Sequence, residues 1–409
     1  MTEQMNVPKL RFSEFEESWN SCTLGELVSV MTDYVASGSF EALRNNVKVY
    51  DEPNHAIYLR LTDLRRDIFG SQLKYVDAAS YTFLEKSNLS GGELLIANIG
   101  ANVGDVYLMP NIEQKATIAP NMIVMRENTL RFKSKFLIHS LKGFYGRKSI
   151  NLAISGSGQP KLSKTDLKKV KVNIPTLPEQ QKIASFLSKV DEKIGLLTEK
   201  KDKLTEYKKG VIQQLFNGMW ENHNGQLTFI PPTLRFKADD GSEFPDWEEK
   251  KLGDLSRTIK SGKSKADDNG TIDLWGSTGK IGFTNEVSHD GHFILVARVG
   301  ANAGKINEVQ GQFGVSDNTL IIDVKPRQHL RFIKYSLLKF DLNRLIFGSG
   351  QPLITGGDLK SHKMVVPNFD EQTKIANFLS AIDQKIDLAN SELEKAKEWK
   401  KGLLQQMFV

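Results

Sequence analysis

The sequence predicts a duplicated α/β (α+β) protein, in which two mixed globular domains are joined by two long helices that form an antiparallel coiled coil. Three observations predict this fold. Residues 156–216 align without a gap with residues 348–408, and about half of the aligned positions are identical. Both segments end in a heptad pattern, and both follow short apolar runs separated by Gly, Asn and Asp clusters. The repeat period of roughly 190 residues exceeds that of solenoid repeats, so the repeated unit is a domain with its connecting helix, which implies pseudo-two-fold symmetry.

Each domain begins with the same short signature. Pro-x-Leu-Arg-Phe is followed by Trp19 and a Leu-Gly-Glu-Leu run in the first half, and by Trp247 and a Leu-Gly-Asp-Leu run in the second. The predicted strands are residues 57–61, 93–97 and 121–125 in the first half and 293–297 and 319–322 in the second. A helical pattern then covers residues 136–153 in one half and 330–347 in the other. Each half therefore contains a mixed globule of about 150 residues.

The long helices are predicted from start signals and periodicity. Thr176-x-x-Glu179 and Asn368-x-x-Glu371 are capping-box signatures. Apolar residues then recur at alternating steps of four and three, with Lys residues interrupting the pattern, and a helix of about 40 residues would be roughly 60 Å long. The predicted coiled-coil seam is Ile183, Leu187, Val190, Ile194, Leu197 and Leu204 in the first helix and Ile375, Leu379, Ile382, Ile386 and Leu393 in the second. The expected boundaries are 1–175 for the first domain, 176–219 for the central helix, 220–366 for the second domain and 367–409 for the C-terminal helix.

The amino-acid composition limits the kinds of partner and cellular compartment that we expect for this chain. The chain has 409 residues, a formal net charge of +6 and a pI near 9.0, which favours an anionic partner without requiring one. Cys22 is the only cysteine, so we expect no internal disulfide, no cysteine zinc site and a reducing cytoplasm. The first residues lack an apolar signal region, and no run approaches the 18 or so apolar residues of a membrane span, so we expect neither secretion nor membrane insertion.

Known catalytic and metal motifs are missing. Residues 257–264 contain Gly-Lys-Ser but place Arg257 where a P-loop needs its first glycine. The Gly-Ala-Asn-x-Gly runs at 100–104 and 300–304 lack dinucleotide spacing and are better interpreted as tight turns between strands. The histidines form no HxxxH or HExxH pair. We therefore predict no catalytic residue and no metal site in this chain.

The remaining candidates form a binding surface. Lys and Arg can neutralise phosphates, whereas Arg, Asn and Gln can contact base edges, although any single one is more often a solvated surface residue. The Gly-Ser-Gly-Gln-Pro runs permit close approach to a ligand, or serve as turns where domain meets helix; the sequence leaves both interpretations open. The candidate DNA-binding residues are Arg60, Arg65, Arg66, Asn102, Arg147, Lys148 and Gln159 in the first half and Lys263, Ser277, Lys280, Arg298, Asn302, Arg344 and Gln351 in the second.

The ordered, duplicated motifs carry a family resemblance. Each half has the Gly-Ser-Gly-Gln-Pro loop, an Asp-Leu-Lys segment, a proline after a strand, a Glu-Gln-x-Lys-Ile-Ala helix start and a terminal Gln-Gln-x-Phe. Over nearly the full chain this order resembles the specificity subunit of type I restriction-modification systems. The resemblance implies that each globule is a target-recognition domain for one half of a bipartite, asymmetric sequence in double-stranded DNA, and that the coiled coil sets the distance between the half-sites.

The resemblance also implies partners. Two modification (methyltransferase) subunits would dock on the coiled coil and bring S-adenosylmethionine, and restriction subunits would add ATP- and Mg-dependent translocation and cleavage, in a bacterial or archaeal cytoplasm. The chain itself would be non-catalytic and bind no cofactor. Two alternatives stay open: a coiled-coil adaptor outside restriction-modification, which would give no sequence-specific footprint, and a self-sufficient nuclease or methyltransferase, which would turn over alone. The sequence does not specify the target bases or the spacer.

Lengthening the first long helix by one heptad should change the length of the DNA spacer and leave both half-sites unchanged. The reason is that the length of the helices sets the distance between the two target-recognition domains. Methylation mapping of the variant measures this. An unchanged spacer would contradict the role of the helices as a ruler.

Overall fold

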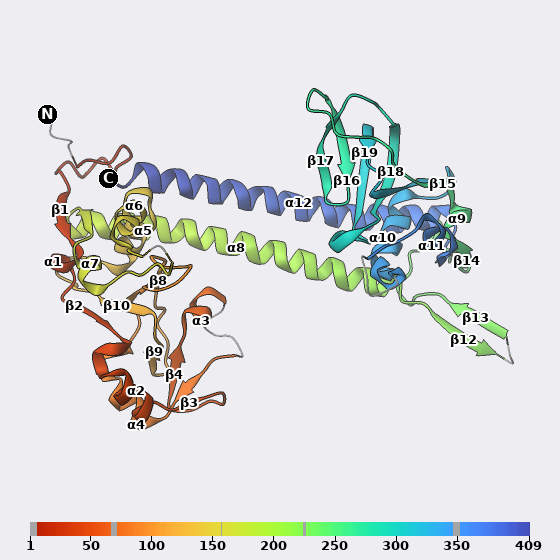
Figure 1. Cartoon of the computed structure of the whole chain (residues 1–409). Helices are drawn as coiled ribbons and strands as arrows, with labels where there is room; N and C mark the ends of the chain where they lie inside the picture. The colour runs from red at the N-terminus through yellow and green to blue at the C-terminus, as the bar shows by residue number, and fades with distance from the viewer. Residues whose placement is uncertain (1–5, 67–71, 157, 224–225, 347–351) are drawn as a thin grey trace. The chain divides into compact units, whose positions relative to one another are not determined.

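The computed structural model describes residues 6–66, 72–156, 158–223, 226–346 and 352–409. The chain divides into two compact units, one made of Met1–Leu197 with Glu392–Val409 and the other of Thr198–Ser391 (Figure 1). Each unit contains one mixed α/β domain and a segment of both long helices, which are α8 (Leu177–Leu215) and α12 (Phe369–Gln406).

The domain of the first unit contains two main sheets. Its elements are β1 (Asn20–Thr23), α1 (Leu24–Leu27), β2 (Val30–Asp33), η1 (Tyr34–Ser37), α2 (Phe40–Asn46), β3 (Val49–Tyr50), β4 (Ala56–Leu59), α3 (Leu61–Arg66), β5 (Tyr75–Val76), α4 (Ala78–Phe83), η2 (Glu85–Ser87), β6 (Asn88–Leu89), β7 (Leu94–Ala97), β8 (Val106–Leu108), β9 (Ala116–Ile118), β10 (Met122–Arg126), α5 (Ser134–Lys142), α6 (Phe144–Ala153), α7 (Lys164–Lys168) and β11 (Lys171–Ile174). The sheets have the strand orders β2-β10-β7-β8 and β3-β5-β4-β9-β6, and β1 pairs with β11.

The domain of the second unit repeats part of this plan. Its elements are β12 (Met219–His223), β13 (Gln226–Ile230), β14 (Glu248–Lys251), α9 (Leu252–Leu255), β15 (Ser256–Ser261), β16 (Ile272–Gly276), β17 (Gly279–Thr284), β18 (His289–Ala297), η3 (Gly300–Asn302), β19 (Ile306–Val315), β20 (Thr319–Val324), α10 (Leu330–Phe340), η4 (Leu342–Leu345), α11 (Gly356–Ser361) and β21 (Lys363–Val366). The main sheet has the order β15-β20-β18-β19-β16-β17, and β14 pairs with β21.

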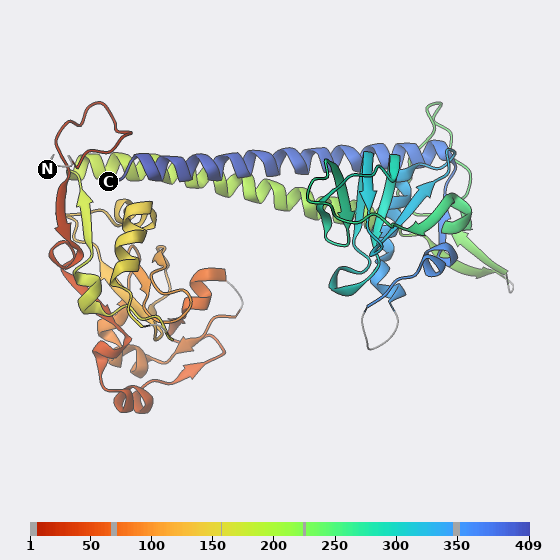
Figure 2. The same cartoon turned by 45° about the horizontal axis from the view of Figure 1, so that its top comes forward.

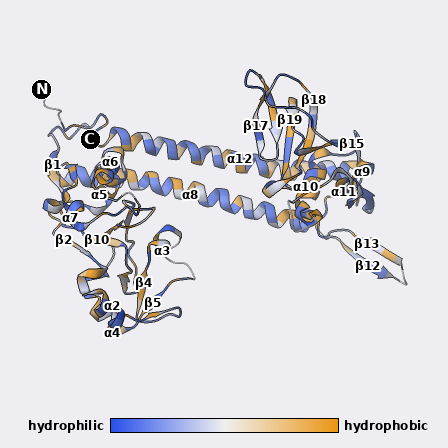
Figure 3. Ribbon diagram, viewed as in Figure 1, coloured by the Kyte–Doolittle hydropathy of each residue, from blue (hydrophilic) through white to orange (hydrophobic). Residues whose placement is uncertain are grey.

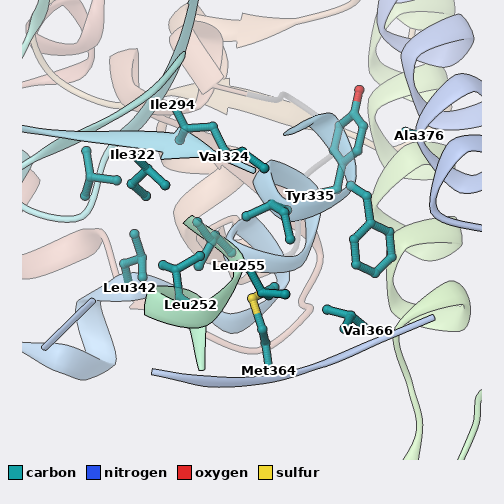
Figure 4. Packing of buried hydrophobic residues seen from close by; sticks show 14 of the residues in the cluster. Leu252, Leu255, Ile294, Ile322, Val324, Tyr335, Leu342, Met364, Val366 and Ala376 are labelled. Atoms are coloured by element: carbon teal, nitrogen blue, oxygen red, sulfur yellow. The ribbon is translucent and has the colours of Figure 1, made fainter. Parts of the chain in front are cut away.

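A four-stranded antiparallel sheet is common to both domains. The order β2-β10-β7-β8 corresponds to β15-β20-β18-β19, and the pair β1–β11 corresponds to β14–β21. The first domain adds a separate five-stranded sheet, whereas the second extends the common sheet with β16 and β17, of which β16 runs parallel to β19. One face of the common sheet in the second domain packs against α9, α10 and α12 (Figure 4). One scaffold therefore carries two different additions.

The predicted strands are confirmed within a few residues, but the two predicted domain helices are each interrupted. The pattern over 136–153 forms α5 and α6, with Gly143 in extended conformation between them. A Cβ on Gly146 would lie 2.2 Å from the carbonyl oxygen of Ser140, so α6 packs directly on the end of α5. The pattern over 330–347 forms α10 and η4, separated by Asp341 at φ 62°; residue 347 lies outside the described residues.

The long helices pack along the predicted seam, and polar and apolar residues alternate along both (Figure 3). In the first unit the α8 residues Ile183, Leu187 and Val190 are buried with Leu403 and Met407, near the end of α12. In the second unit the α12 residues Ile375, Leu379 and Ile382 are buried with Val211 and Leu215, near the end of α8. The start of each helix lies beside the end of the other, so the helices run antiparallel (Figure 2). Of the remaining seam residues, Leu393 is buried and Ile194, Leu197, Leu204 and Ile386 are half-buried.

Two of the lysines that interrupt the heptads have a partner on the opposite helix. Lys400 pairs with Asp191 in the first unit, and Lys208 pairs with Asp383 in the second. The two pairs occupy equivalent positions in the repeat. Polar groups at seam positions lower stability but favour one register of the helices, because any other register leaves the charges without partners.

A buried carboxylate fixes α8 to the first domain. Glu179 is 1% exposed and accepts from Nε and Nη2 of Arg11, both at 2.7 Å, and from Trp19 Nε1 at 3.2 Å. Gln180, also 1% exposed, donates to the carbonyl of Pro175 at 2.9 Å. The N-terminal segment, the domain and the helix start are therefore joined at one point.

The second unit repeats this joint. Glu371 is fully buried and accepts from Nε and Nη2 of Arg235, at 3.0 and 2.7 Å, and from Trp247 Nε1 at 3.2 Å. Asn368 caps the helix by accepting from the backbone N–H of Glu371 at 3.0 Å. The capping-box prediction is therefore only half right, because the glutamate side chain bonds to a distant arginine and the cap is one-sided.

Aromatic contacts complete each joint with the end of the opposite helix. Phe408, just after α12, lies 6.0 Å from the ring of Trp19 and 5.5 Å from that of Phe136. Phe216, just after α8, lies 6.3 Å from Trp247 and 5.3 Å from Phe332. The terminal Gln-Gln-x-Phe of each repeat thus provides an anchor for the helix that ends in that unit.

Replacing Arg235 with Ala should destabilise the second unit by about 3–5 kcal/mol, because it leaves Glu371 buried without its cation. Thermal unfolding measures the effect. The matched control is Lys237→Ala, which removes an exposed ion pair with Glu243 and should change little. Equal effects of the two substitutions would show that the buried joint is not the stabilising element.

Candidate nucleic-acid interface

The two Gly-Ala-Asn-x-Gly runs form the same loop in both domains. Each follows the central strand of the common sheet: β7 ends at Ala97 and β18 ends at Ala297. In the first loop Gly104 N–H donates to Ala97 O at 2.8 Å and Asp105 N–H to Asn102 O at 3.1 Å. In the second, Gly304 N–H donates to Ala297 O and Lys305 N–H to Asn302 O, both at 2.9 Å. The interpretation of these runs as tight turns between strands is confirmed.

Left-handed glycines make the turns possible. Gly100 and Gly104 have φ of 92° and 86°, and Gly300 and Gly304 have 77° and 85°. A Cβ on Gly104 would also lie 2.9 Å from Ile150. These positions therefore require glycine on conformational grounds.

The loops meet the Gly-Ser-Gly-Gln-Pro runs. Gly100 N–H donates to Pro160 O, and Gly300 N–H donates to Pro352 O, each at 3.0 Å. Short β-bridges join Ile99 to Lys161 and Val299 to Leu353. We call residues 97–105 with 160–162, and 297–305 with 352–354, the two loop frames. Gln159 is exposed beside the first frame, whereas Gln351 lies outside the described residues.

Equivalent positions of the frames carry different side chains. Position 98 is Asn and position 298 is Arg; position 105 is Asp and position 305 is Lys. Asp105 pairs with Arg147 at 2.8 Å, and Lys305 donates to the carbonyl of Thr278 at 2.9 Å. The frames therefore present different hydrogen-bonding groups from the same backbone.

The hairpin β16–β17 carries two of the second-half candidates. Ser277 lies in its turn, and Lys280 pairs with Asp273 at 2.7 Å and lies 4.3 Å from the ring of Phe283. Lys263 is exposed just beyond β15. The link from Lys305 to Thr278 connects this hairpin with the second loop frame.

The remaining candidates are dispersed. Arg60 is held before α3 by Asp63, with Nη2–Oδ1 at 2.7 Å, and also donates to the carbonyl of Gln72 at 2.7 Å. These bonds show a structural role for its guanidinium. Arg65 is exposed on α3, and Arg344 is exposed on η4. Arg66 ends α3, and its side chain is outside the description.

A basic cavity of about 670 Å³ lies in the first unit between α5, α6 and the end of α12. It contains the candidates Arg147 and Lys148. Its lining residues are Lys142, Gly143, Phe144, Arg147, Lys148, Asn151, Leu152, Lys397, Lys400, Lys401, Leu404 and Gln405. Partial removal from water, reinforced by the charge of Lys400, lowers the pKa of Lys142. Such crowded positive charge favours an anionic ligand.

A second pocket, in the second unit between β19, α10 and the first half of α12, contains cations that are paired. Glu308 bonds to Arg331 at 2.7 Å, Lys334 at 2.6 Å and His292 at 2.9 Å. Burial opposes ionisation, but these donors outweigh it and lower the pKa of Glu308 to about 2. The two units therefore differ in the positive charge that they offer near the long helices.

The structure brings Asn102, Gln159, Arg298 and Asn302 to the loop frames and Arg147 and Lys148 to the basic cavity. Asn98, which takes the place of Arg298 in the first loop frame, was not among the predicted candidates. Aligning the two Gly-Ala-Asn-x-Gly runs shows its position, because the alignment places Asn98 opposite Arg298.

In the described part of the chain, no three His, Cys, Asp or Glu side chains are grouped so that they could hold a metal ion. Among the described residues, no helix is both long and apolar enough to span a membrane.

A repeated loop frame with unlike side chains, carried twice on paired helices, defines a two-domain recognition protein. The chain belongs to the type I restriction-modification DNA specificity family, since the model of the type I restriction modification DNA specificity domain matches residues 16–206 and 245–398. This membership confirms the resemblance found in the sequence and places the chain among the specificity subunits, which recognise DNA and are non-catalytic.

Similar proteins agree with this assignment. The provisionally named type I restriction enzyme MjaX specificity subunit of Methanocaldococcus jannaschii is 25% identical over 433 residues, covering 99% of this chain and 96% of that protein. The MjaVIII specificity subunit of the same organism is 25% identical over 442 residues, covering 99% and 95%. The crystal structure of a type I restriction-modification S subunit from M. genitalium has a TM-score of 0.64 at 17% identity, covering 98% of this chain and 99% of that one, and so shares the fold.

His139, on α5 beneath the basic cavity, should make the first unit sensitive to acid. Burial, together with Lys400, lowers its pKa from 6.5 to about 4, although Asp191 opposes this. Its contribution to stability is therefore complete above pH 6.5 and is lost as the pH falls toward 4. The difference in thermal midpoint between the native protein and His139→Gln should shrink over this range. A difference independent of pH would mean that His139 does not titrate in this way.

Proposed function

We propose that the two domains read two different half-sites of a bipartite, asymmetric sequence in double-stranded DNA. The observation that carries this proposal is the duplicated loop frame: the backbone is the same in both domains, whereas the groups at positions 98 and 298, and at 105 and 305, differ. Hydrogen-bonding side chains specify bases, so unlike side chains on like frames read unlike sequences. The different additions to the common sheet support the same conclusion.

The long helices set the spacer and hold two modification subunits, which bind S-adenosylmethionine; restriction subunits add ATP- and Mg-dependent activity. The paired lysines and aspartates in the seam support a fixed register, which a ruler requires. In this proposal residues 1–175 and 220–366 are the readers, 176–219 and 367–409 are the helices, and the complex acts in a bacterial or archaeal cytoplasm.

The exposed cations contribute affinity that does not depend on sequence. Lys148 and Arg147 in the basic cavity and Lys263 in the second domain can neutralise phosphates. The basic cavity of the first unit supplies the denser cluster, whereas Arg331 and Lys334 of the second unit are paired with Glu308.

Base-modification sequencing tests the proposal. DNA from cells that express this chain with a cognate modification subunit is compared with DNA from cells that lack this chain. We expect a new methylated motif with two unlike halves and a fixed spacer. A palindromic motif, or no motif from an assembled complex, would contradict the proposal.

A further inference from the structure

Asn98 and Arg298 are held by the same backbone bonds. The N–H of Asn98 donates to Asn121 O at 3.1 Å, and its carbonyl accepts from Leu162 at 2.8 Å. The N–H of Arg298 donates to Asn318 O at 2.9 Å, and its carbonyl accepts from Ile354 at 2.9 Å. Each residue therefore bridges the common sheet and the segment after the Gly-Ser-Gly-Gln-Pro run. The backbone is fixed on both sides, so the two side chains start from equivalent positions.

Both side chains contain a buried polar atom without a hydrogen-bond partner among the described residues: Oδ1 of Asn98 and Nε of Arg298. In the second domain the hydroxyls of Ser316 and Thr319, two residues before and one residue after Asn318, also have no hydrogen-bond partner among the residues that the structure describes. Folded proteins rarely leave such groups without a partner, so each one requires an explanation. Positions 105 and 305 differ in this respect, since Asp105 and Lys305 both bond within their domains.

A ligand can reach both residues. Asn98 and Arg298 are half-exposed and directly follow β7 and β18, two residues before Gly100 and Gly300. A Cβ built on either glycine meets no atom within 4 Å. The space beside each frame is therefore open, and the glycines allow a ligand to approach the backbone closely.

We propose that residues 98 and 298 are equivalent base-reading positions: Arg298 recognises a guanine in the half-site of the second domain, and Asn98 recognises an adenine in the half-site of the first. This inference rests on the proposed function. The Arg guanidinium directs two parallel N–H groups at guanine O6 and N7, and the Asn amide donates to adenine N7 while it accepts from N6. Because Oδ1 of Asn98 and Nε of Arg298 are buried in the free protein, each side chain turns toward the open space beside its frame before these atoms meet a base.

The test uses the complete complex with its modification subunits and maps the methylated sequences. Arg298→Gln removes the positive charge. Arg298→Lys keeps the positive charge but removes the two parallel N–H groups of the guanidinium. Both should lower the preference for one guanine in one half-site by roughly 10- to 100-fold, with the other half-site and the spacer unchanged. Asn98→Ala should relax an adenine in the opposite half-site. The matched control is Arg257→Gln, an exposed arginine of the same domain, which should leave the motif unchanged.

Three results would overturn the inference. One is a native motif that has no guanine in the half-site of the second domain. Another is Arg298→Lys methylating the native motif with unaltered preference, because a phosphate contact or a purely structural role needs only the charge or the fold. The third is an equal loss at both half-sites. Unaltered preference in the variants alongside a native bipartite motif would leave the proposed function intact, whereas the absence of any native motif would overturn both.

Discussion

The buried glutamate at the start of each long helix is the interaction on which the rest of the structure depends. Glu179 and Glu371 are removed from water, and a carboxylate in that position is tolerated only with a cation and further donors around it. Arg11 and Arg235 provide the cation from the first residues of each domain, and a tryptophan N–H provides the additional donor. The first residues of each domain and the start of its long helix, which are distant in sequence, are thereby tied together, so the direction in which each helix leaves its domain is fixed.

The joint at the start of each helix and the polar pairs of the seam act together to select one register of the helices. A helix held at its start can still slide along its partner, but the pairs Lys400–Asp191 and Lys208–Asp383 penalise every register except one. Phe408 and Phe216 then dock the end of each helix against the tryptophan of the joint. The start of each long helix, its register against the other helix and its end are each specified by different residues. All of these residues lie in segments that the two repeats share.

The sequence was sufficient for the elements that depend on local pattern. Duplication, heptads and alternating strands are periodic signals, and they predicted the two domains, the antiparallel helices and most of the seam. The sequence did not predict contacts between residues that are far apart in the chain. Glu179 was interpreted as a local helix cap, although its partner Arg11 lies 168 residues away. The interruption at Gly143 depends on the close packing of α6 on α5, and the one at Asp341 on a backbone with positive φ; neither is contained in the periodicity of the sequence. Arg60 was predicted from its charge, and its pairing with Asp63 is a contact that the charge alone does not reveal.

The positions that hold the architecture and the positions that differ between repeats are separate. Glycines, backbone hydrogen bonds and the buried joints are shared by the halves, so a change in any of them would disturb the domain itself. Residues 98 and 298 take part in the frame only through their backbone, which any non-proline residue can provide. A substitution there alters the group offered to a base without altering the loop, the sheet or the helix. Recognition can therefore differ between two halves that keep one scaffold, and the spacing of the readers stays independent of what each one reads.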